Sequence, residues 1–226
     1  MTDSQELRFR VNERAGEVGA LLRRPSDARC LLVMAHGAGA DMRHAFMQAM
    51  SEQLAERSIA SLRFQFPYME KGRRAPDRAG VLQDSVRAAI AAAAKHAGDL
   101  PLLAGGKSMG GRMTSLAASS GMLPGVRGLV FFGFPLHAAG KTSSERGEHL
   151  EQVKLPLLFL QGTRDKLALL ERMRPLCSGL GKRATLHVVE GGDHSFHVLK
   201  RSGRTDALVL GELADAVSAW ASGLVD

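Results

Sequence analysis

The chain has 226 residues, of which 45% are hydrophobic and 23% charged, the balance of an ordinary globular protein. This length suits one α/β domain, which we expect over residues 1–226, with a core that needs no disulfide framework. The two cysteines, Cys30 and Cys177, are therefore expected to be buried thiols. A net charge of +7 would suit nucleic acid, but the basic residues are scattered and base-stacking aromatics are few, so no nucleic-acid partner is expected.

The N-terminal segment, MTDSQELRFRVNE, is polar and contains acidic residues. It lacks the apolar stretch of a secretory signal. Elsewhere we find no apolar run that approaches the roughly 20 residues needed to cross a bilayer. These observations predict a cytoplasmic protein with no membrane partner.

Short apolar runs alternate with helical patterns along the chain, beginning with two short strands joined by a turn at residues 13–16. The expected strands, in chain order, are 7–11, 17–22, 30–35, 59–66, 102–104, 129–132, 157–160 and 185–189. Helical spacing of apolar residues falls at 46–54, 82–93, 109–120, 167–180 and 209–220. Alternating strands and helices predict an α/β fold, with a doubly wound, mostly parallel sheet flanked by helices. The longest irregular stretches are 67–80 and 135–153.

The clearest chemical motif is Gly106-Lys-Ser-Met-Gly110, which matches the G-x-S-x-G nucleophile elbow. A strand precedes it and a helix follows it, as this motif requires. The predicted nucleophile is Ser108. The same letters could end a phosphate-binding P-loop, but that motif needs glycine at position 101, which is Pro101.

A serine nucleophile needs a base, and the base needs an acid that orients it. His194 is the predicted base, because it lies in a glycine-rich loop between the last expected strand and the last helix. Asp165, directly after an apolar strand, is the predicted acid, and it completes the order Ser…Asp…His. Asp193 is the alternative acid, although adjacent side chains seldom meet.

The oxyanion of an acyl-transfer reaction needs two hydrogen-bond donors. We predict the backbone N–H groups of Met109, which follows the nucleophile, and of Ala38 in the loop His36-Gly-Ala-Gly-Ala40. His36 itself is expected to position that loop, with a substrate contact as the tentative alternative. The histidines and cysteines show no metal-binding pattern, and no dinucleotide fingerprint follows the first strand–helix turn. No metal or cofactor is therefore expected.

Six motifs, spread from His36 to Phe196, give the sequence a family likeness: HGAGADMRHAFM, RFQFPYMEKGRRAPDR, GGKSMGGRM, FPLHAAGK, LFLQGTRD and GGDHSF. The chain resembles the α/β-hydrolase superfamily, and more closely its small dienelactone-hydrolase-like members. Within these it is similar to a bacterial group related to a human testis-expressed protein and to a chromatin-complex subunit.

The resemblance implies a serine-hydrolase site at the carboxyl edge of the sheet, with Ser108, Asp165 and His194 as the triad and Met109 and Ala38 as oxyanion donors. Dienelactone hydrolases proper have a cysteine nucleophile, so their chemistry is not carried over to this serine. The chain is too short for a large cap domain. The stretch 135–153 is the one candidate for a small lid.

These features predict a serine hydrolase that cleaves a small ester or thioester through an acyl-enzyme. The alternative is a non-catalytic binding or scaffold protein on the same fold, since a fold does not establish activity. A peptidase is a weaker hypothesis, because no gating domain is expected.

Arg73, Arg74 and His137 lie in the two long loops after strand ends and are tentative contacts for an anionic substrate. The opposing possibility is that these loop charges pair locally, for example Glu70 with Arg74.

Overall fold

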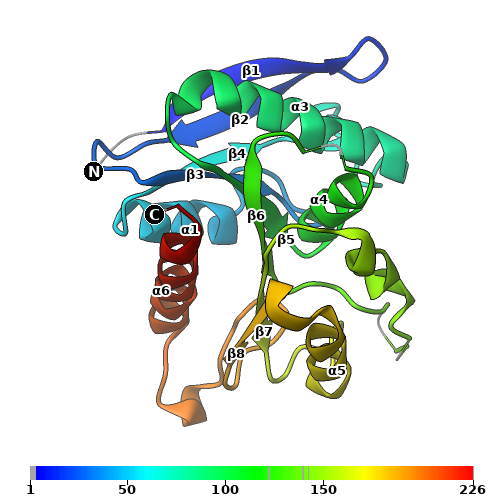
Figure 1. Ribbon diagram of the computed structural model, residues 1–226, viewed down its shortest axis with the longest axis vertical. Helices are drawn as coiled ribbons and strands as arrows, with labels where there is room; N and C mark the ends of the chain where they lie inside the picture. Colours follow the sequence, from blue (N-terminus) through cyan, green and yellow to red (C-terminus); the bar gives the residue numbers. More distant parts are fainter. Residues whose placement is uncertain (1–3, 122, 139, 142, 226) are drawn as a thin grey trace.

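The computed structural model describes residues 4–121, 123–138, 140–141 and 143–225. Eight strands form one sheet in the order β1-β2-β4-β3-β5-β6-β7-β8 (Figure 1). In chain order they are β1 (Gln5–Asn12), β2 (Gly16–Arg23), β3 (Cys30–Ala35), β4 (Ile59–Phe64), β5 (Leu102–Lys107), β6 (Val126–Phe132), β7 (Leu157–Gly162) and β8 (Ala184–Val189). The β1–β2 and β2–β4 pairs are antiparallel, and the remaining neighbours are parallel.

Helices cover both faces of this sheet. They are α1 (Ala45–Ala55), α2 (Pro67–Glu70), α3 (Ala79–Ala97), α4 (Met109–Ser119), α5 (Leu170–Leu180) and α6 (Asp206–Val225), with 3₁₀ turns at Glu145–Gln152, Gly181–Arg183 and Lys200–Ser202. The apolar residues of α3, α4 and α5 form one core cluster with one face of the sheet, and those of α1 and α6 form a second cluster with the other face. The predicted fold, a mostly parallel sheet flanked by helices without a large cap domain, is confirmed.

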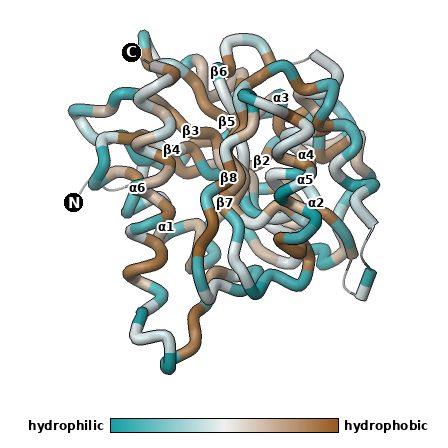
Figure 2. The backbone as a smooth tube through the Cα atoms, turned by 60° about the horizontal axis from the view of Figure 1, so that its bottom comes forward, coloured by the Kyte–Doolittle hydropathy of each residue, from teal (hydrophilic) through white to brown (hydrophobic). Residues whose placement is uncertain are grey.

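The central strands are apolar because both of their faces are covered. Every residue of β3, β4 and β7 is buried, and these strands run through the hydrophobic middle of Figure 2. Buried parallel strands have this continuous apolar pattern, in contrast to the alternating pattern of a half-exposed sheet. Both cysteines are free and buried, as expected.

The last helix corrects one expectation. By length and composition, Asp206–Leu224 within α6 is apolar enough to cross a membrane, although no run of that length was recognised in the sequence. In the structure, one face of α6 packs into the second core cluster through Val209, Leu213 and Val217. Its carboxylates also bind neighbouring elements: Asp215 accepts a hydrogen bond of 2.6 Å from Arg57. Through these contacts α6 covers part of one face of the sheet, and 28% of the Asp206–Leu224 segment is buried.

Several element boundaries differ from the predicted ones by a few residues, and two of these differences lie next to the candidate site. The strand β5 continues to Lys107, since Gly105 and Gly106 remain in the sheet. The helix α5 begins at Leu170, three residues later than expected. In the stretch 135–153, Ala139 and Thr142 lie outside the described residues, and the 3₁₀ turn at Glu145–Gln152 packs against α4.

Candidate active site

Ser108 occupies a sharp turn between β5 and α4. Its backbone has φ 50° and ψ −116°, a conformation that residues with a side chain rarely adopt. A Cβ atom at Gly106 or Gly110 would lie 2.2 Å or 2.3 Å from the backbone oxygen of Ala35 in β3. The two motif glycines therefore let the turn pack directly against the neighbouring strand. The side chain of Ser108 is left pointing out of the carboxyl edge of the sheet.

The structure brings the three predicted triad residues together. The Ser108 hydroxyl donates to His194 Nε2 over 2.8 Å, and His194 Nδ1–H donates to Asp165 Oδ2, also over 2.8 Å. Asp165 follows β7 and His194 follows β8, so parallel strands deliver both residues to one edge of the sheet. This chain of hydrogen bonds sets the imidazole tautomer in which Nε2 can accept a proton from the serine.

Asp165 is held rigidly beneath the histidine. Its side chain is fully buried; Oδ1 accepts from the Leu167 N–H over 2.7 Å, and Oδ2 also accepts from Gln161 Nε2 over 2.5 Å. The alternative acid, Asp193, instead caps its own loop, where it accepts from the N–H groups of Ser195 and His197. The geometry therefore favours Asp165 as the partner of His194.

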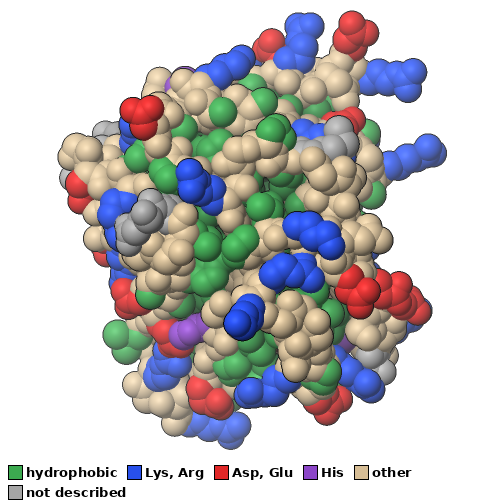
Figure 3. All heavy atoms as spheres, viewed as in Figure 1, with side chains coloured by type: hydrophobic (Ala, Val, Ile, Leu, Met, Phe, Trp, Pro, Cys, Tyr) green, Lys and Arg blue, Asp and Glu red, His purple; other side chains and the backbone are tan. Residues whose placement is uncertain are grey.

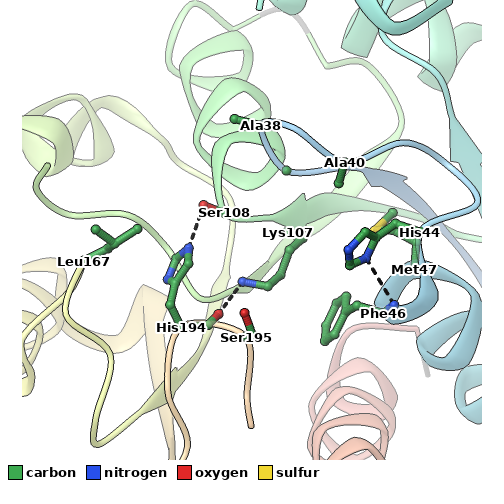
Figure 4. A pocket seen from close by; sticks show the side chains of 11 residues that line it. Ala38, Ala40, His44, Phe46, Met47, Lys107, Ser108, Leu167, His194 and Ser195 are labelled. Atoms are coloured by element: carbon green, nitrogen blue, oxygen red, sulfur yellow. Dashed lines mark hydrogen bonds between the residues drawn. The ribbon is translucent and has the colours of Figure 1, made fainter. Parts of the chain in front are cut away.

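A cavity of about 320 Å³ opens at Ser108. It is lined by Gly37, Ala38, Ala40, His44, Phe46, Met47, Lys107, Ser108, Leu167, His194 and Ser195 (Figure 4). Ala38 is exposed in the loop after β3 and faces this cavity. Met109 is the first residue of α4, where backbone N–H groups have no acceptor within the helix. Both predicted oxyanion donors thus belong to segments that border the serine.

His36 lies beneath the cavity and is fully buried. Its Nε2 accepts from the Phe66 N–H over 3.2 Å, and its Nδ1–H donates to the Gly37 carbonyl over 2.9 Å. Burial lowers the pKa of His36 from 6.5 to about 4, which keeps the ring neutral. The described residues that line the cavity do not include His36, and its expected part in positioning the loop agrees with these bonds.

The other tentative substrate contacts do not reach the cavity lining. Arg73 and Arg74 are exposed, and Arg73 is bound to Asp77 over 2.5 Å. Glu70, considered as a partner of Arg74, instead binds Arg8 over 2.9 Å. His137 is buried, and its Nε2 accepts from the Leu169 N–H over 3.3 Å. Leu169 directly precedes α5.

Lys107 is a pocket residue that sequence reasoning missed. Its ammonium group donates to the His194 carbonyl over 2.5 Å and lies 5.7 Å and 5.4 Å from the ring centres of Phe46 and Phe196. Burial lowers the pKa of this lysine from 10.5 to about 8. A Cβ at Gly133 would come within 3.2 Å of the ammonium nitrogen. The only signal in the sequence was a lysine at the variable position before the nucleophile.

Comparison with known proteins assigns the chain to a family. Residues 28–222 match the model of the α/β hydrolase domain, and the chain belongs to that family. The fold also matches a dienelactone hydrolase from Anabaena variabilis, with a TM-score of 0.77 and 19% identity over 99% of this chain and 100% of the other.

Two further solved structures show the same fold. An α/β serine hydrolase without a lid from Xanthomonas campestris matches with a TM-score of 0.73 and 21% identity, over 97% of this chain and 96% of the other. Est1E from Butyrivibrio proteoclasticus, solved with ferulic acid, matches with a TM-score of 0.72 and 17% identity, over 92% and 96%. At these identities the matches establish the fold and leave the substrate open.

Proposed function

We propose that this protein is a serine hydrolase that cleaves a small ester or thioester through an acyl-enzyme at Ser108. The observation that carries the proposal is the unbroken hydrogen-bonded chain from Asp165 through His194 to Ser108, which ends in an open cavity. A volume of about 320 Å³ is at the lower end of small-molecule sites and supports a small substrate.

The reaction proposed for this geometry has two halves. Ser108 Oγ attacks the carbonyl carbon while His194 Nε2 takes the hydroxyl proton, and Asp165 stabilises the imidazolium that forms. The N–H groups of Met109 and Ala38 stabilise the oxyanion. His194 then gives its proton to the leaving alcohol or thiol. In the second half, water attacks the acyl carbon while His194 takes its proton; the bond from the acyl carbon to Ser108 Oγ then breaks, His194 returns the proton to Oγ, and the acid product leaves.

Both cysteines are free and buried, which supports the proposal that the protein works in a reducing compartment, the cytoplasm. The proposed chemistry uses only the residues of the site and needs no cofactor. A non-catalytic scaffold would not need the positive-φ serine, whose strained backbone costs about 1–3 kcal/mol. Its retention supports the enzyme over the scaffold.

Covalent labelling with a fluorophosphonate tests the proposal. Wild-type protein should be labelled and should hydrolyse short nitrophenyl esters, whereas Ser108→Ala should lose labelling and at least roughly 10³-fold of its turnover. Ser195→Ala is the matched control, because Ser195 lines the same cavity, while the described hydrogen bonds of the His194 ring go to Ser108 and Asp165. A wild-type protein that is neither labelled nor active, or a Ser108→Ala variant that keeps its label, would overturn the assignment.

A further inference from the structure

The loop that joins β3 to α1 carries Ala38, one of the two proposed oxyanion donors, and borders the cavity (Figure 4). Near its middle, the Ala40 N–H donates to the Gly37 carbonyl over 3.2 Å, and the turn between them places Gly39 at φ 74°. A four-residue turn fixes its own shape. Its place beside Ser108 depends on what holds the two ends of the loop.

Both ends of this loop are bound to residues at the end of β4 or directly after it. The first end is held at His36, whose ring accepts from the Phe66 N–H. The second end is held at Met42, whose N–H donates to the side-chain oxygen Oε1 of Gln65 over 2.9 Å. The Met42 carbonyl also accepts from Arg63 Nη1 over 3.2 Å. The loop is therefore held between two anchor points.

Gln65 is itself anchored to the sheet. Its backbone N–H donates to the Gly19 carbonyl over 2.9 Å, which continues the pairing of β2 with β4 by one residue. The Met42 side chain packs on the same glycine, since a Cβ atom at Gly19 would lie 3.1 Å from Met42 Cε. Through these contacts, Gln65 connects the end of the loop to the hydrogen-bonded strands.

We propose that Gln65 is a positioning residue for the oxyanion hole, acting through Met42 to keep the Ala38 N–H directed at the oxyanion. The inference rests on the proposed hydrolase function and deepens it. Gln65 is not among the described residues that line the cavity, so its effect is indirect. An oxyanion donor stabilises the transition state only where the negative charge develops, and a displacement of about 1 Å can cost roughly 10²-fold in rate.

The bond from Met42 to Gln65 can be removed while the other contacts of the loop remain. The Arg63 bond to the Met42 carbonyl and the Phe66 bond to His36 do not involve the Gln65 side chain. Because that side chain is only half-buried, water can replace the lost amide oxygen. Loss of the bond should therefore loosen the loop and leave the fold intact.

Steady-state kinetics on a short nitrophenyl ester test the inference, with active sites counted by fluorophosphonate titration. Gln65→Leu should lower kcat about tenfold with little change in KM or Tm, because the lost interaction acts on the transition state. Gln65→Glu, which can still accept from the Met42 N–H, should recover most of this loss. Gln83→Leu is the matched control, because it removes a half-buried glutamine of α3 that accepts from Arg87, and it should leave kcat unchanged.

A pair of ketone inhibitors separates lost positioning from a general loss of structure. In a trifluoromethyl ketone, Ser108 Oγ attacks the carbonyl carbon, His194 takes the hydroxyl proton, and the former carbonyl oxygen becomes an oxyanion. The matching methyl ketone is less electrophilic and binds as the intact ketone. Gln65→Leu should weaken binding of the trifluoromethyl ketone by about the same factor as kcat/KM and leave binding of the methyl ketone unchanged.

The outcomes distinguish this inference from the proposed function. Wild-type kinetics in Gln65→Leu, or equal weakening of both ketones, would overturn the inference while the hydrolase function stands. A wild-type protein without hydrolase activity would overturn the proposed function and the inference with it. If Gln65→Leu does not fold, Gln65→Asn takes its place with the same expected loss, because its shorter side chain cannot reach the Met42 N–H.

Discussion

The ammonium group of Lys107 donates a hydrogen bond to the backbone carbonyl oxygen of His194 over 2.5 Å. Lys107, which directly precedes the proposed nucleophile, thus binds the backbone of His194, the proposed base. These two residues come from separate parts of the sheet, because Lys107 ends β5 and His194 follows β8. The loop after β8 is also bound to the loop after β7, where the Arg164 N–H donates to the Gly192 carbonyl over 2.8 Å. The bond from Lys107 adds a direct link between the elbow and the backbone of His194.

Replacing Lys107 by Met should lower kcat by about tenfold or more with little change in KM, because small displacements of a proposed catalytic group are costly. Met keeps the apolar contacts with Phe46 and Phe196 but donates no hydrogen bond. Steady-state kinetics on a nitrophenyl ester measure the effect, and Lys107→Arg, which can still donate to the carbonyl, should recover part of it. A change confined to KM would instead assign Lys107 to substrate binding.

The same lysine predicts an alkaline limit to activity. Because burial lowers its pKa to about 8, the charged donor is present below that pH and is lost as the pH rises through it. Wild-type kcat, corrected for hydroxide-driven hydrolysis, should decline above about pH 8. The Lys107→Met variant should show no such decline, since it has no proton to lose there. If both proteins lost activity alike above about pH 8, Lys107 would not be the cause of the decline.

Asp165→Asn should leave the fold intact and reduce turnover by about 10²–10⁴-fold, because an amide stabilises neither the required tautomer nor the imidazolium of His194. Asp193→Asn is the matched control. Asp193 touches the backbone of its own loop and does not contact the imidazole, so its effect on turnover should be much smaller. The reverse order of the two effects would show that Asp193 is the acid.

One buried histidine, His36, and one half-buried histidine, His149, predict a loss of stability in acid. Burial lowers the pKa values of His36 and His149 from 6.5 to about 4, so the unfolded chain takes up their protons first as the pH falls. The free energy of unfolding should therefore decrease between about pH 6.5 and 4, by about 3 kcal/mol for His36 alone.

Urea unfolding at several pH values measures this decrease. His149→Gln should make the decrease smaller. His197→Gln should not, because Asp206 raises the pKa of that exposed histidine, and its proton stabilises the folded state at low pH. A free energy of unfolding that stays constant from pH 6.5 to 4 would contradict the assignment.

Local patterns in the sequence were enough to predict the sheet, the helices on both its faces and the residues of the candidate triad. Gly106 and Gly110 lie on either side of Ser108 because the turn packs against β3. The sequence shows this steric requirement directly, because both glycines belong to the five-residue motif. Asp165 and His194 were predictable because parallel strands end at one edge of the sheet, so the positions after strands converge.

Contacts between distant segments had no such local signal. The Leu169 N–H, just before α5, donates to His137, a residue 32 positions earlier in the chain. The bond from Lys107 to His194 spans 87 positions. Arg63 occupies a strand position whose neighbours are apolar, and only the arrangement of β1, β2 and α1 shows that it faces a cavity.

The loop arginines provide the last prediction. The sequence makes Arg73 and Arg74 tentative contacts for an anionic substrate, but both are exposed outside the described cavity lining. On the face seen in Figure 3 the basic side chains are spread out. Arg73→Ala combined with Arg74→Ala should therefore leave the ratio of kcat/KM values for a carboxylate-terminated and a methyl-terminated ester unchanged. In the ion pair between Arg73 and Asp77, the Arg73 side chain is half-exposed. Loss of this pair should therefore lower the free energy of unfolding by only about 0–1 kcal/mol. Lys107 is the cation that does line the cavity, and Lys107→Met in the same assay tests whether it contributes to any preference for the anionic ester. If the double variant alone changed that ratio, the loop would have to close over the site during turnover, and the original assignment of the two arginines would be restored.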